Sequence, residues 1–234
     1  MDCIILAGGL GTRLRSVVSE VPKCMAPVAG KPFLYYILKY LTGYNTIDKV
    51  IISVGYLRET IFDWIENNKE QYPFEFDFAV EEVPLGTGGG IKLAMKKVKT
   101  DSVLVLNGDT FFDVNIDAFL EQHKDCGGQL SVALKPLQHF DRYGNVILEG
   151  SRVTAFREKE LCAEGLINGG VYILSKNASL FENLPDKFSF ETEVLQPATL
   201  QNRISGFIYE SYFIDIGIPE DYAKANEEFK TLFL

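Results

Sequence analysis

A glycine-rich segment near the N-terminus, LAGGLGTRL (Leu6–Leu14), has the residue types that bind a phosphate chain. Its three glycines let backbone N–H groups approach phosphates closely, and Arg13 offers a forked cation that can bind two phosphate oxygens. The spelling excludes a P-loop, which needs Gly-Lys-Ser/Thr, and a dinucleotide fingerprint, which needs Gly or Ala where Leu14 stands. Without Arg13, the segment is equally well explained as a turn that lets a helix pack closely on a strand.

Two aspartates occupy similar contexts far apart in the chain. Asp109, in NGDTFFDVN, follows an apolar run, and Asp215, in YFIDIGIPEDY, follows another. Mg²⁺ prefers one or two carboxylates together with phosphate oxygens, and α/β sheets place such ligands at the carboxyl ends of strands. The pair therefore predicts a Mg²⁺ site, although either aspartate alone could cap a turn or a helix. Lys23, in PKCMAPVAGKP, could reach the same phosphates, but an isolated lysine is more often a plain surface residue.

Alternating strands and helices are expected to position these residues. Buried strands are predicted at Cys3–Leu6, Val50–Val54 and Val103–Leu106, and a strand of alternating polarity at Phe74–Val80. Helices are predicted at Pro32–Leu41, Glu59–Ile65, Gly90–Val98 and Asp117–Lys124. Strands with antiparallel hairpins are predicted at Leu130–Leu134, Asn145–Leu148, Val153–Phe156 and Gly170–Leu174, followed by helices at Glu191–Leu200 and Glu220–Phe233.

This order predicts an α/β fold, with a Rossmann-like mixed, mostly parallel central sheet flanked by helices. We expect a single domain over residues 1–234. Its first half, about residues 1–115, should bind nucleotide, and its second half, about residues 116–234, should offer a different ligand surface.

Composition narrows the classes of function. The chain has 234 residues, of which 47% are hydrophobic, enough for one substantial core. The net charge of −9, without a basic cluster, argues against a nucleic acid partner. The apolar runs fall short of the roughly 20 residues of a membrane span, and Asp2 argues against a signal peptide, so we expect a cytoplasmic protein. The four cysteines are scattered, which favours neither a zinc site nor a disulfide framework.

Several ordered motifs together resemble the sugar-1-phosphate nucleotidyltransferase family across essentially the whole chain. They are GGLGTRL, PKCMAPVAGKP, EEVPLGTGGG, NGD, FREK, NGGVY and DIGIPEDY. The stretches LRSVVSEVPK, MAPVAGKPFL, SVGYL and PLGTGGGI look closest to members that transfer GMP to D-glycero-α-D-manno-heptose 1-phosphate. Those members make GDP-heptose for bacterial surface polysaccharide.

The resemblance implies a role for each matching residue. Glu81 matches the position from which thymidylyl members read the base, and a carboxylate there can accept from both N1–H and the exocyclic amine of guanine, which favours GTP. The implied catalytic residues are Arg13, Lys23, Asp109, Lys159 and Asp215, with Asp109 and Asp215 as the metal ligands. The implied nucleotide-binding residues are Leu6, Ala7, Gly8, Gly9, Gly11, Thr12, Arg13, Lys23, Glu81, Gly86, Thr87, Asn107, Gly108 and Asp109. The implied sugar-phosphate-binding residues are Gly144, Glu158, Lys159, Asn168 and Gly169.

The expected reaction is a Mg²⁺-dependent transfer of GMP from GTP to a sugar 1-phosphate, with release of pyrophosphate. GTP or another nucleoside triphosphate and the sugar phosphate are the expected partners, no nucleic acid or membrane is expected, and a homodimer is left open. Within enzymes, a uridylyl- or thymidylyltransferase acting on a hexose or amino sugar 1-phosphate is the alternative. A nucleotide-sensing regulatory domain is the non-enzymatic alternative, because a fold does not dictate a function.

Overall fold

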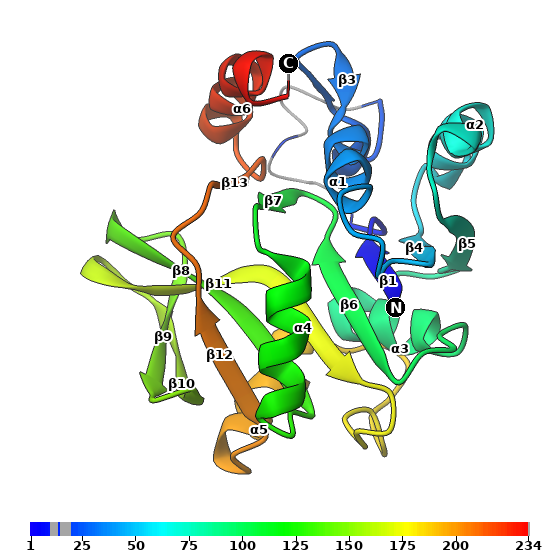
Figure 1. The fold of residues 1–234 in the computed structure, drawn as a ribbon. Helices are drawn as coiled ribbons and strands as arrows, with labels where there is room; N and C mark the ends of the chain where they lie inside the picture. The colour runs from blue at the N-terminus through cyan, green and yellow to red at the C-terminus, as the bar shows by residue number, and fades with distance from the viewer. Residues whose placement is uncertain (10–13, 15–19, 234) are drawn as a thin grey trace.

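The fold is built around one central sheet with helices on both faces (Figure 1). It is described from a computed structural model that covers residues 1–9, 14 and 20–233. The strands are β1 (Asp2–Leu6), β2 (Pro27–Val28), β3 (Lys31–Pro32), β4 (Lys49–Val54), β5 (Glu75–Val80), β6 (Ser102–Asn107), β7 (Thr110–Phe112), β8 (Leu130–Phe140), β9 (Gly144–Glu149), β10 (Arg152–Lys159), β11 (Cys162–Ser175), β12 (Ile204–Ile208) and β13 (Phe213–Asp215). The α-helices are α1 (Phe33–Leu41), α2 (Arg58–Asn68), α3 (Gly86–Met95), α4 (Ile116–Asp125), α5 (Gln196–Leu200) and α6 (Pro219–Leu232), and short helical turns are η1 (Lys23–Met25), η2 (Lys69–Gln71) and η3 (Glu191–Leu195).

In the part of the chain that is described, the central sheet has the strand order β5-β4-β1-β6-β11-β8-β12-β10-β9. The first four strands pair in parallel, and β6 then meets β11 antiparallel. Beyond β11 the pairing is antiparallel except for β12, which runs parallel to β8. The expected mixed α/β sheet is therefore confirmed, with crossovers in its first half and hairpins in its second.

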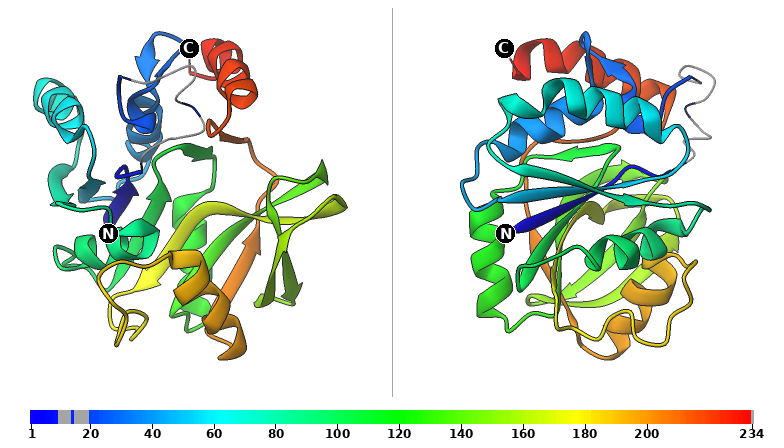
Figure 2. Two further views of the ribbon diagram at one scale, coloured as in Figure 1. Left: turned by 180° about the vertical axis from the view of Figure 1, so that it is seen from behind. Right: turned by 90° about the vertical axis from the view of Figure 1, so that its right-hand side faces the viewer.

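Alternate residues of β1 show how both faces of the sheet are covered. Cys3 and Ile5 belong to a core formed with α1, α2, α4 and α6, whereas Ile4 belongs to a core formed with α3, η3 and α5. Figures 1 and 2 show α4 on one side of the sheet and α3 and α5 on the other. Because successive strand side chains point to opposite faces, a continuous apolar run serves both cores.

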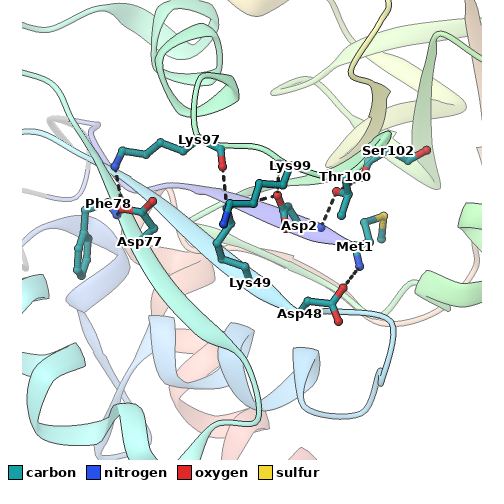
Figure 3. A network of polar contacts seen from close by, with 10 residues as sticks. All are labelled: Met1, Asp2, Asp48, Lys49, Asp77, Phe78, Lys97, Lys99, Thr100 and Ser102. Atoms are coloured by element: carbon teal, nitrogen blue, oxygen red, sulfur yellow. Dashed lines mark hydrogen bonds and ion pairs between the residues drawn. The ribbon is translucent and has the colours of Figure 1, made fainter.

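A network of polar contacts lies at the amino ends of β1 and β4 (Figure 3). Asp2 and Lys49 are both buried, and Lys49 Nζ lies 3.5 Å from Asp2 Oδ2. Lys49 Nζ also donates to Lys97 O at 2.7 Å, and Lys99 N donates to Asp2 Oδ2 at 2.6 Å. A buried charge pair needs such further hydrogen bonds to offset its lost hydration. The network ties the connection between α3 and β6 to this end of the sheet, away from the carboxyl end of β1.

The helix predicted at Gly90–Val98 begins earlier, since α3 spans Gly86–Met95. Helical periodicity starts too late because the first turn contains glycines, which are poor helix formers. The glycines are there for space: a Cβ on Gly88 would overlap the ring of Phe188. The packing, not helix propensity, therefore decides where α3 begins.

Two later elements also differ from the sequence expectation. The strand predicted at Gly170–Leu174 extends over Cys162–Ser175, because a bulge after Asn168 breaks the two-residue periodicity that would have revealed the whole strand. The helix predicted at Glu191–Leu200 is a π-helical turn, η3, followed by α5. Pro197 explains this change, since proline disrupts the regular α-helical hydrogen bonding of the preceding turn.

Within the described ranges, no helix combines the length and the apolar character needed to cross a membrane.

Candidate active site

The carboxyl end of β1 leads into one wall of a cleft. Ala7 N donates to Ser53 O on the neighbouring strand β4 at 2.8 Å. Gly8 then packs directly on Glu81, so that a Cβ on Gly8 would overlap Glu81 Oε1. Gly9 is exposed and has open space where a Cβ would stand. The backbone here is therefore accessible to a ligand from one side and held against Glu81 from the other.

The acidic residues predicted to hold a metal lie side by side although they are far apart in the sequence. Asp109 lies between β6 and β7, and Asp215 ends β13, where it pairs with Thr110 of β7. Ile216 N donates to Asp109 O at 3.0 Å, which fixes the two loops together. Lys23 Nζ lies 2.5 Å from Asp109 Oδ2 and 3.7 Å from Asp215 Oδ1. A single cationic group thus spans both carboxylates.

This arrangement fits a divalent cation. Oxygen ligands from two carboxylates are the donor set that Mg²⁺ takes when phosphates supply further ligands, and Lys23 shows that one cation can reach both. The ammonium of Lys23 is mostly buried, with 12% of the side chain exposed, while 36% of Asp109 and 25% of Asp215 remain exposed toward incoming groups. Burial and the charge of Asp109 raise the pKa of the thiol of the neighbouring Cys24 to about 12, so this thiol stays uncharged at neutral pH.

Asn107 and Gly108 bring the end of β6 close to β1. Gly108 N donates to Leu6 O at 3.0 Å, and a Cβ on Gly108 would lie only 2.5 Å from that oxygen. Asn107 lies against Gly170, which has a φ of +71° and whose Cβ would be 2.6 Å from Asn107 Nδ2. Glycine suits Gly108 because of the close approach to Leu6 O, and it suits Gly170 because of the positive φ together with the contact to Asn107.

Glu81 is held in one orientation by the protein. Its Oε1 accepts a hydrogen bond from Ser53 Oγ at 3.1 Å, and its Oε2 accepts from Leu85 N at 3.0 Å. Ser53 is fully buried. Each carboxylate oxygen has two lone-pair positions, so each retains an acceptor site for a ligand. Glu81 is therefore an oriented acceptor in the cleft and, at the same time, an anchor of the loop before α3.

A cleft of about 460 Å³ collects most of these groups. It is lined by Leu6, Gly8, Gly9, Glu81, Pro84, Gly86, Thr87, Gly90, Asn107 and Asp109. A second hollow of about 380 Å³ shares Gly8, Glu81 and Pro84 with it. The cleft thus joins the glycine backbone after β1, the oriented carboxylate of Glu81 and the carboxylate of Asp109.

Asn168 and Gly169 occupy the bulge of β11. Asn168 Nδ2 donates to the hydroxyl of Tyr172 at 2.8 Å, and Gly170 N donates to Asn168 Oδ1 at 3.0 Å. Gly169 is buried, and a Cβ there would overlap the ring of Phe112. Because Gly170 packs on Asn107, the bulge carries these sugar-binding candidates to the edge of the cleft.

Glu158 and Lys159 lie farther out, exposed at the end of β10. Lys159 pairs across the sheet with Gly144 of β9, and Asn145 pairs with Ile167, the residue before the bulge. Among the described residues, no hydrogen bond or ion pair joins Lys159 to the acidic pair. The structure therefore places these candidates on one end of the sheet without bringing Lys159 into contact with Asp109.

Two groups near the site were missed by the sequence reasoning. One is Tyr143, whose pKa is raised by burial and then by the charge of Asp215. Its position beside Gly144 was the available signal. Glu191 Oε2 accepts from Thr87 Oγ1 at 2.8 Å, and no sequence signal pointed to this contact.

Three predicted phosphate-binding residues, Gly11, Thr12 and Arg13, lie outside the described residues. Their role stays a prediction.

Comparisons with known proteins agree on one family and one type of reaction. The family model described as nucleotidyl transferase matches residues 2–231. The chain is 50% identical over 228 residues to a D-glycero-alpha-D-manno-heptose 1-phosphate guanylyltransferase from Aneurinibacillus thermoaerophilus, covering 97% of this chain and 98% of the relative. It is 44% identical over 224 residues to the Campylobacter jejuni protein with the same name, covering 95% and 97%.

A solved structure is similar over the same extent. The crystal structure of HddC from Yersinia pseudotuberculosis complexed with GMP-PN matches with a TM-score of 0.86 and 40% sequence identity, covering 97% of this chain and 99% of that one.

Proposed function

This chain belongs to the nucleotidyl transferase family, and from that premise we propose that it transfers GMP from GTP to D-glycero-α-D-manno-heptose 1-phosphate and releases pyrophosphate. It is a sugar-1-phosphate nucleotidyltransferase, similar along nearly its whole length to relatives named as heptose 1-phosphate guanylyltransferases. The product, GDP-heptose, would serve the synthesis of bacterial surface polysaccharide. We place the reaction in the cytoplasm, where GTP is available.

The observation that carries the proposal is the cluster of Lys23, Asp109 and Asp215 beside the cleft. The sugar phosphate oxygen attacks the α-phosphorus of GTP in line, the bond to the β-phosphate oxygen breaks, and pyrophosphate leaves. Because the attacking phosphate is already an anion, the reaction needs no general base. Catalysis then reduces to holding two anions together, aligning them and neutralising charge.

Asp109 and Asp215 would hold Mg²⁺, which would neutralise charge on the reacting phosphates. Lys23 shares both carboxylates, so its ammonium is placed to pass from them to a phosphate oxygen when the nucleotide enters. Backbone N–H groups after β1 and Arg13 would bind the triphosphate. Glu81 would accept from guanine N1–H and N2–H, with Gly86 letting the base approach the backbone.

We further propose a division of labour along the single domain. Residues 1–115 would bind the nucleotide, and residues 116–234 would supply Gly144, Glu158, Lys159, Asn168 and Gly169 for the sugar phosphate. Lys159 would neutralise the acceptor phosphate. A homodimer stays a prediction.

Measuring pyrophosphate release tests the reaction. GTP, ATP, CTP, UTP and dTTP should each be offered with heptose, mannose, glucose and N-acetylhexosamine 1-phosphates in the presence of Mg²⁺. The highest kcat/KM is expected for GTP with the heptose 1-phosphate. A wild type that prefers UTP or dTTP would replace the guanylyl assignment by the uridylyl or thymidylyl alternative, and binding without turnover would favour a nucleotide sensor.

Lys159→Ala tests the division of labour. The variant should raise KM for the sugar phosphate while leaving KM for GTP close to that of the wild type, since an acceptor-phosphate cation does not contact the triphosphate. Lys176→Ala, which removes an exposed lysine just beyond the end of β11, is a matched control for loss of a positive charge. Equal increases in both Michaelis constants for Lys159→Ala would contradict the division.

A further inference from the structure

The N-terminal turn of α3 forms a wall of the cleft but has no cap of its own. Its N-cap residue is Leu85, which has no polar side chain, and no side-chain cap is present. A helix begins with backbone N–H groups that lack partners within the helix, so they must be satisfied from elsewhere. For α3 the partners come from residues 186–191, far along the chain.

Backbone contacts join these segments, and we call the contact between residues 85–89 and 186–191 the α3 seam. Gly88 N donates to Phe188 O at 3.1 Å, and Gly89 N donates to the same oxygen at 3.4 Å. In return, Phe188 N donates to Leu85 O at 2.9 Å. The carbonyl of Phe188 therefore acts as the missing cap.

The glycines of α3 make this approach possible. A Cβ on Gly86 would lie 2.6 Å from Phe188 O, and a Cβ on Gly89 would overlap Asp186 O. Both contacts are with backbone atoms, which cannot rotate away as a side chain can. Glycine at positions 86 and 89 is therefore explained by the α3 seam and not by a ligand alone.

Side chains complete the seam at the mouth of the cleft. Thr87 lines the cleft, and its Oγ1 donates to Glu191 Oε2 at 2.8 Å and accepts from Phe190 N at 2.9 Å. Ser189 Oγ donates to the same carboxylate oxygen at 3.0 Å. The carboxylate also lies near the amino end of α3, where negative charge is favourable. Glu191 begins the π-helical turn η3, a conformation that is frequent at functional sites.

We propose that Glu191 is a positioning residue of the nucleotide cleft: it holds Thr87, and with it the first turn of α3, in the conformation that receives GTP. The proposal rests on the proposed function, since it takes GTP to be the occupant. It goes beyond the proposed division of labour, because a residue of the sugar-phosphate half (residues 116–234) shapes the nucleotide site of residues 1–115. Its effect also reaches Glu81, since Leu85 N is the partner of Glu81 Oε2.

A competing role for Glu191 is direct contact with the sugar phosphate. After burial, the charge of Glu191 is the next cause that raises the pKa of Tyr172, whose hydroxyl accepts from Asn168. The charge of Glu191 therefore acts on the tyrosine that bonds to Asn168, one of the sugar-binding candidates. The two roles differ in which substrate loses affinity and in whether the charge is needed.

The dissociation constant of GTP, measured by titration calorimetry with Mg²⁺ present and without the sugar phosphate, separates these roles. Glu191→Ala and Thr87→Val should each raise Kd for GTP about 5- to 10-fold, the expected effect of losing one exposed positioning hydrogen bond. Glu191→Gln keeps a side-chain oxygen that can accept from Thr87, and Thr87→Ser keeps the hydroxyl, so both should bind GTP nearly as the wild type does. Glu193→Ala, in the same turn but with Ser189 N as its partner, is the matched control and should not change Kd.

A double-variant cycle tests whether Glu191 acts through Thr87. The double variant Glu191→Ala, Thr87→Val should bind GTP no more weakly than either single variant, because residues acting as a unit are not additive. The proposal would be overturned if the increases in Kd of the two single variants multiplied in the double variant. It would also be overturned if Glu191→Ala bound GTP as the wild type does. An increase confined to KM for the sugar phosphate, or a Glu191→Gln variant as weak as Glu191→Ala, would assign Glu191 to the acceptor instead. A wild type that does not bind GTP would reject the proposed function itself.

Discussion

At the acidic pair, charge and position determine what each residue can do. Asp109 and Asp215 approach each other because β7 and β13 form a short antiparallel ribbon, and Lys23 offsets part of their mutual repulsion. Like charges held this close are unfavourable without a cation. If the proposed Mg²⁺ binds here with the triphosphate, we expect it to replace the Lys23 ammonium between the two carboxylates.

Asp109→Asn and Asp215→Asn should each reduce kcat by about 10²-fold or more, because each removes a carboxylate charge that would hold Mg²⁺ against the reacting phosphates. Asp215→Asn leaves a side-chain oxygen that can accept from Gly217 N, as Asp215 Oδ1 does at 2.7 Å, so the fold should persist. Steady-state rates over a range of Mg²⁺ concentrations, with thermal unfolding as a check of folding, measure the effect. Asp113→Asn, at an exposed position after β7, is the matched control. A wild-type rate in either variant at limiting Mg²⁺ would contradict the metal assignment.

Glu81→Gln should lower the preference for GTP over UTP and dTTP by about 1 to 3 kcal/mol in relative kcat/KM. The amide keeps the shape but turns one acceptor into a donor that faces a donor of guanine. One oxygen remains for Leu85 N or Ser53 Oγ, so the loop before α3 should keep its place. Glu82→Gln, at the exposed neighbour that pairs with Arg58, is the matched control. If Glu81→Gln kept the full preference for GTP, we would conclude that backbone groups, and not Glu81, recognise guanine.

At the scale of single elements, α3 shows packing overriding intrinsic propensity. A helix that begins Gly-Thr-Gly-Gly-Gly would be weak in isolation, because each glycine is about 1 kcal/mol less favourable than alanine in a helix. Here Gly88, Gly89 and Gly90 are all buried, and the space beside them is filled by residues of other elements. The element is stable because of what it packs against.

Gly89→Ala should therefore destabilise the protein, although alanine normally stabilises a helix. Its Cβ would overlap Asp186 O and approach Leu85 Cβ to 2.7 Å, so the backbone must shift. We expect a loss of about 1 to 3 kcal/mol in the free energy of unfolding, the usual range for overpacking. Urea denaturation measures it. Gly9→Ala, whose Cβ would meet nothing within 4 Å, is the control for adding a methyl group. A stability gain in Gly89→Ala would contradict the packing argument.

For the molecule as a whole, His123 links stability to pH. Its ring is buried between α4, β8 and β11, where Nδ1 lies 2.8 Å from Ser131 Oγ and Nε2 lies 3.1 Å from Ser175 Oγ. Burial, with a smaller contribution from the charge of Lys124, lowers the pKa of His123 from 6.5 to about 4. The folded protein therefore keeps this histidine neutral over a range in which the unfolded chain protonates it.

Stability should consequently fall as pH decreases from 6.5 to about 4. Above this window His123 is neutral in both states and makes no pH-dependent contribution. Within it only the unfolded chain binds the proton, which lowers the free energy of unfolding by up to about 1.4 kcal/mol per pH unit. Below it the histidine is protonated in both states and the loss is complete.

Comparison of the wild type with His123→Gln isolates this contribution from that of the carboxylates. The variant should be less stable at pH 7 but should lose less stability between pH 6.5 and 4 than the wild type does. Urea denaturation at several pH values provides both curves. His139→Gln, at an exposed position in β8, is the matched control and should retain the wild-type pH dependence. If the free energy of unfolding of wild type and His123→Gln changed with pH in parallel, His123 would not be the source of this pH dependence.

The sequence by itself determined the fold class, most elements and the set of site candidates. Runs such as that of β4, which is buried along its whole length, reveal strands because their apolar character is local. The glycines after β1 and the motifs around Asp109 and Asp215 reveal chemistry because residue type and spacing are also local. The family resemblance supplied the expected roles of Glu81, Lys159 and Asn168, which no periodicity could give.

Only the tertiary structure decided which of these residues meet. The pairing of β7 with β13 brings Asp215 to Asp109, and the α3 seam brings Glu191 to Thr87. Both depend on contacts between residues more than 100 positions apart, which no local pattern encodes. The same reason explains the early start of α3 and the bulge of β11: steric limits set by Phe188 and Asn107 select glycine there, and those neighbours are known only once the chain is folded.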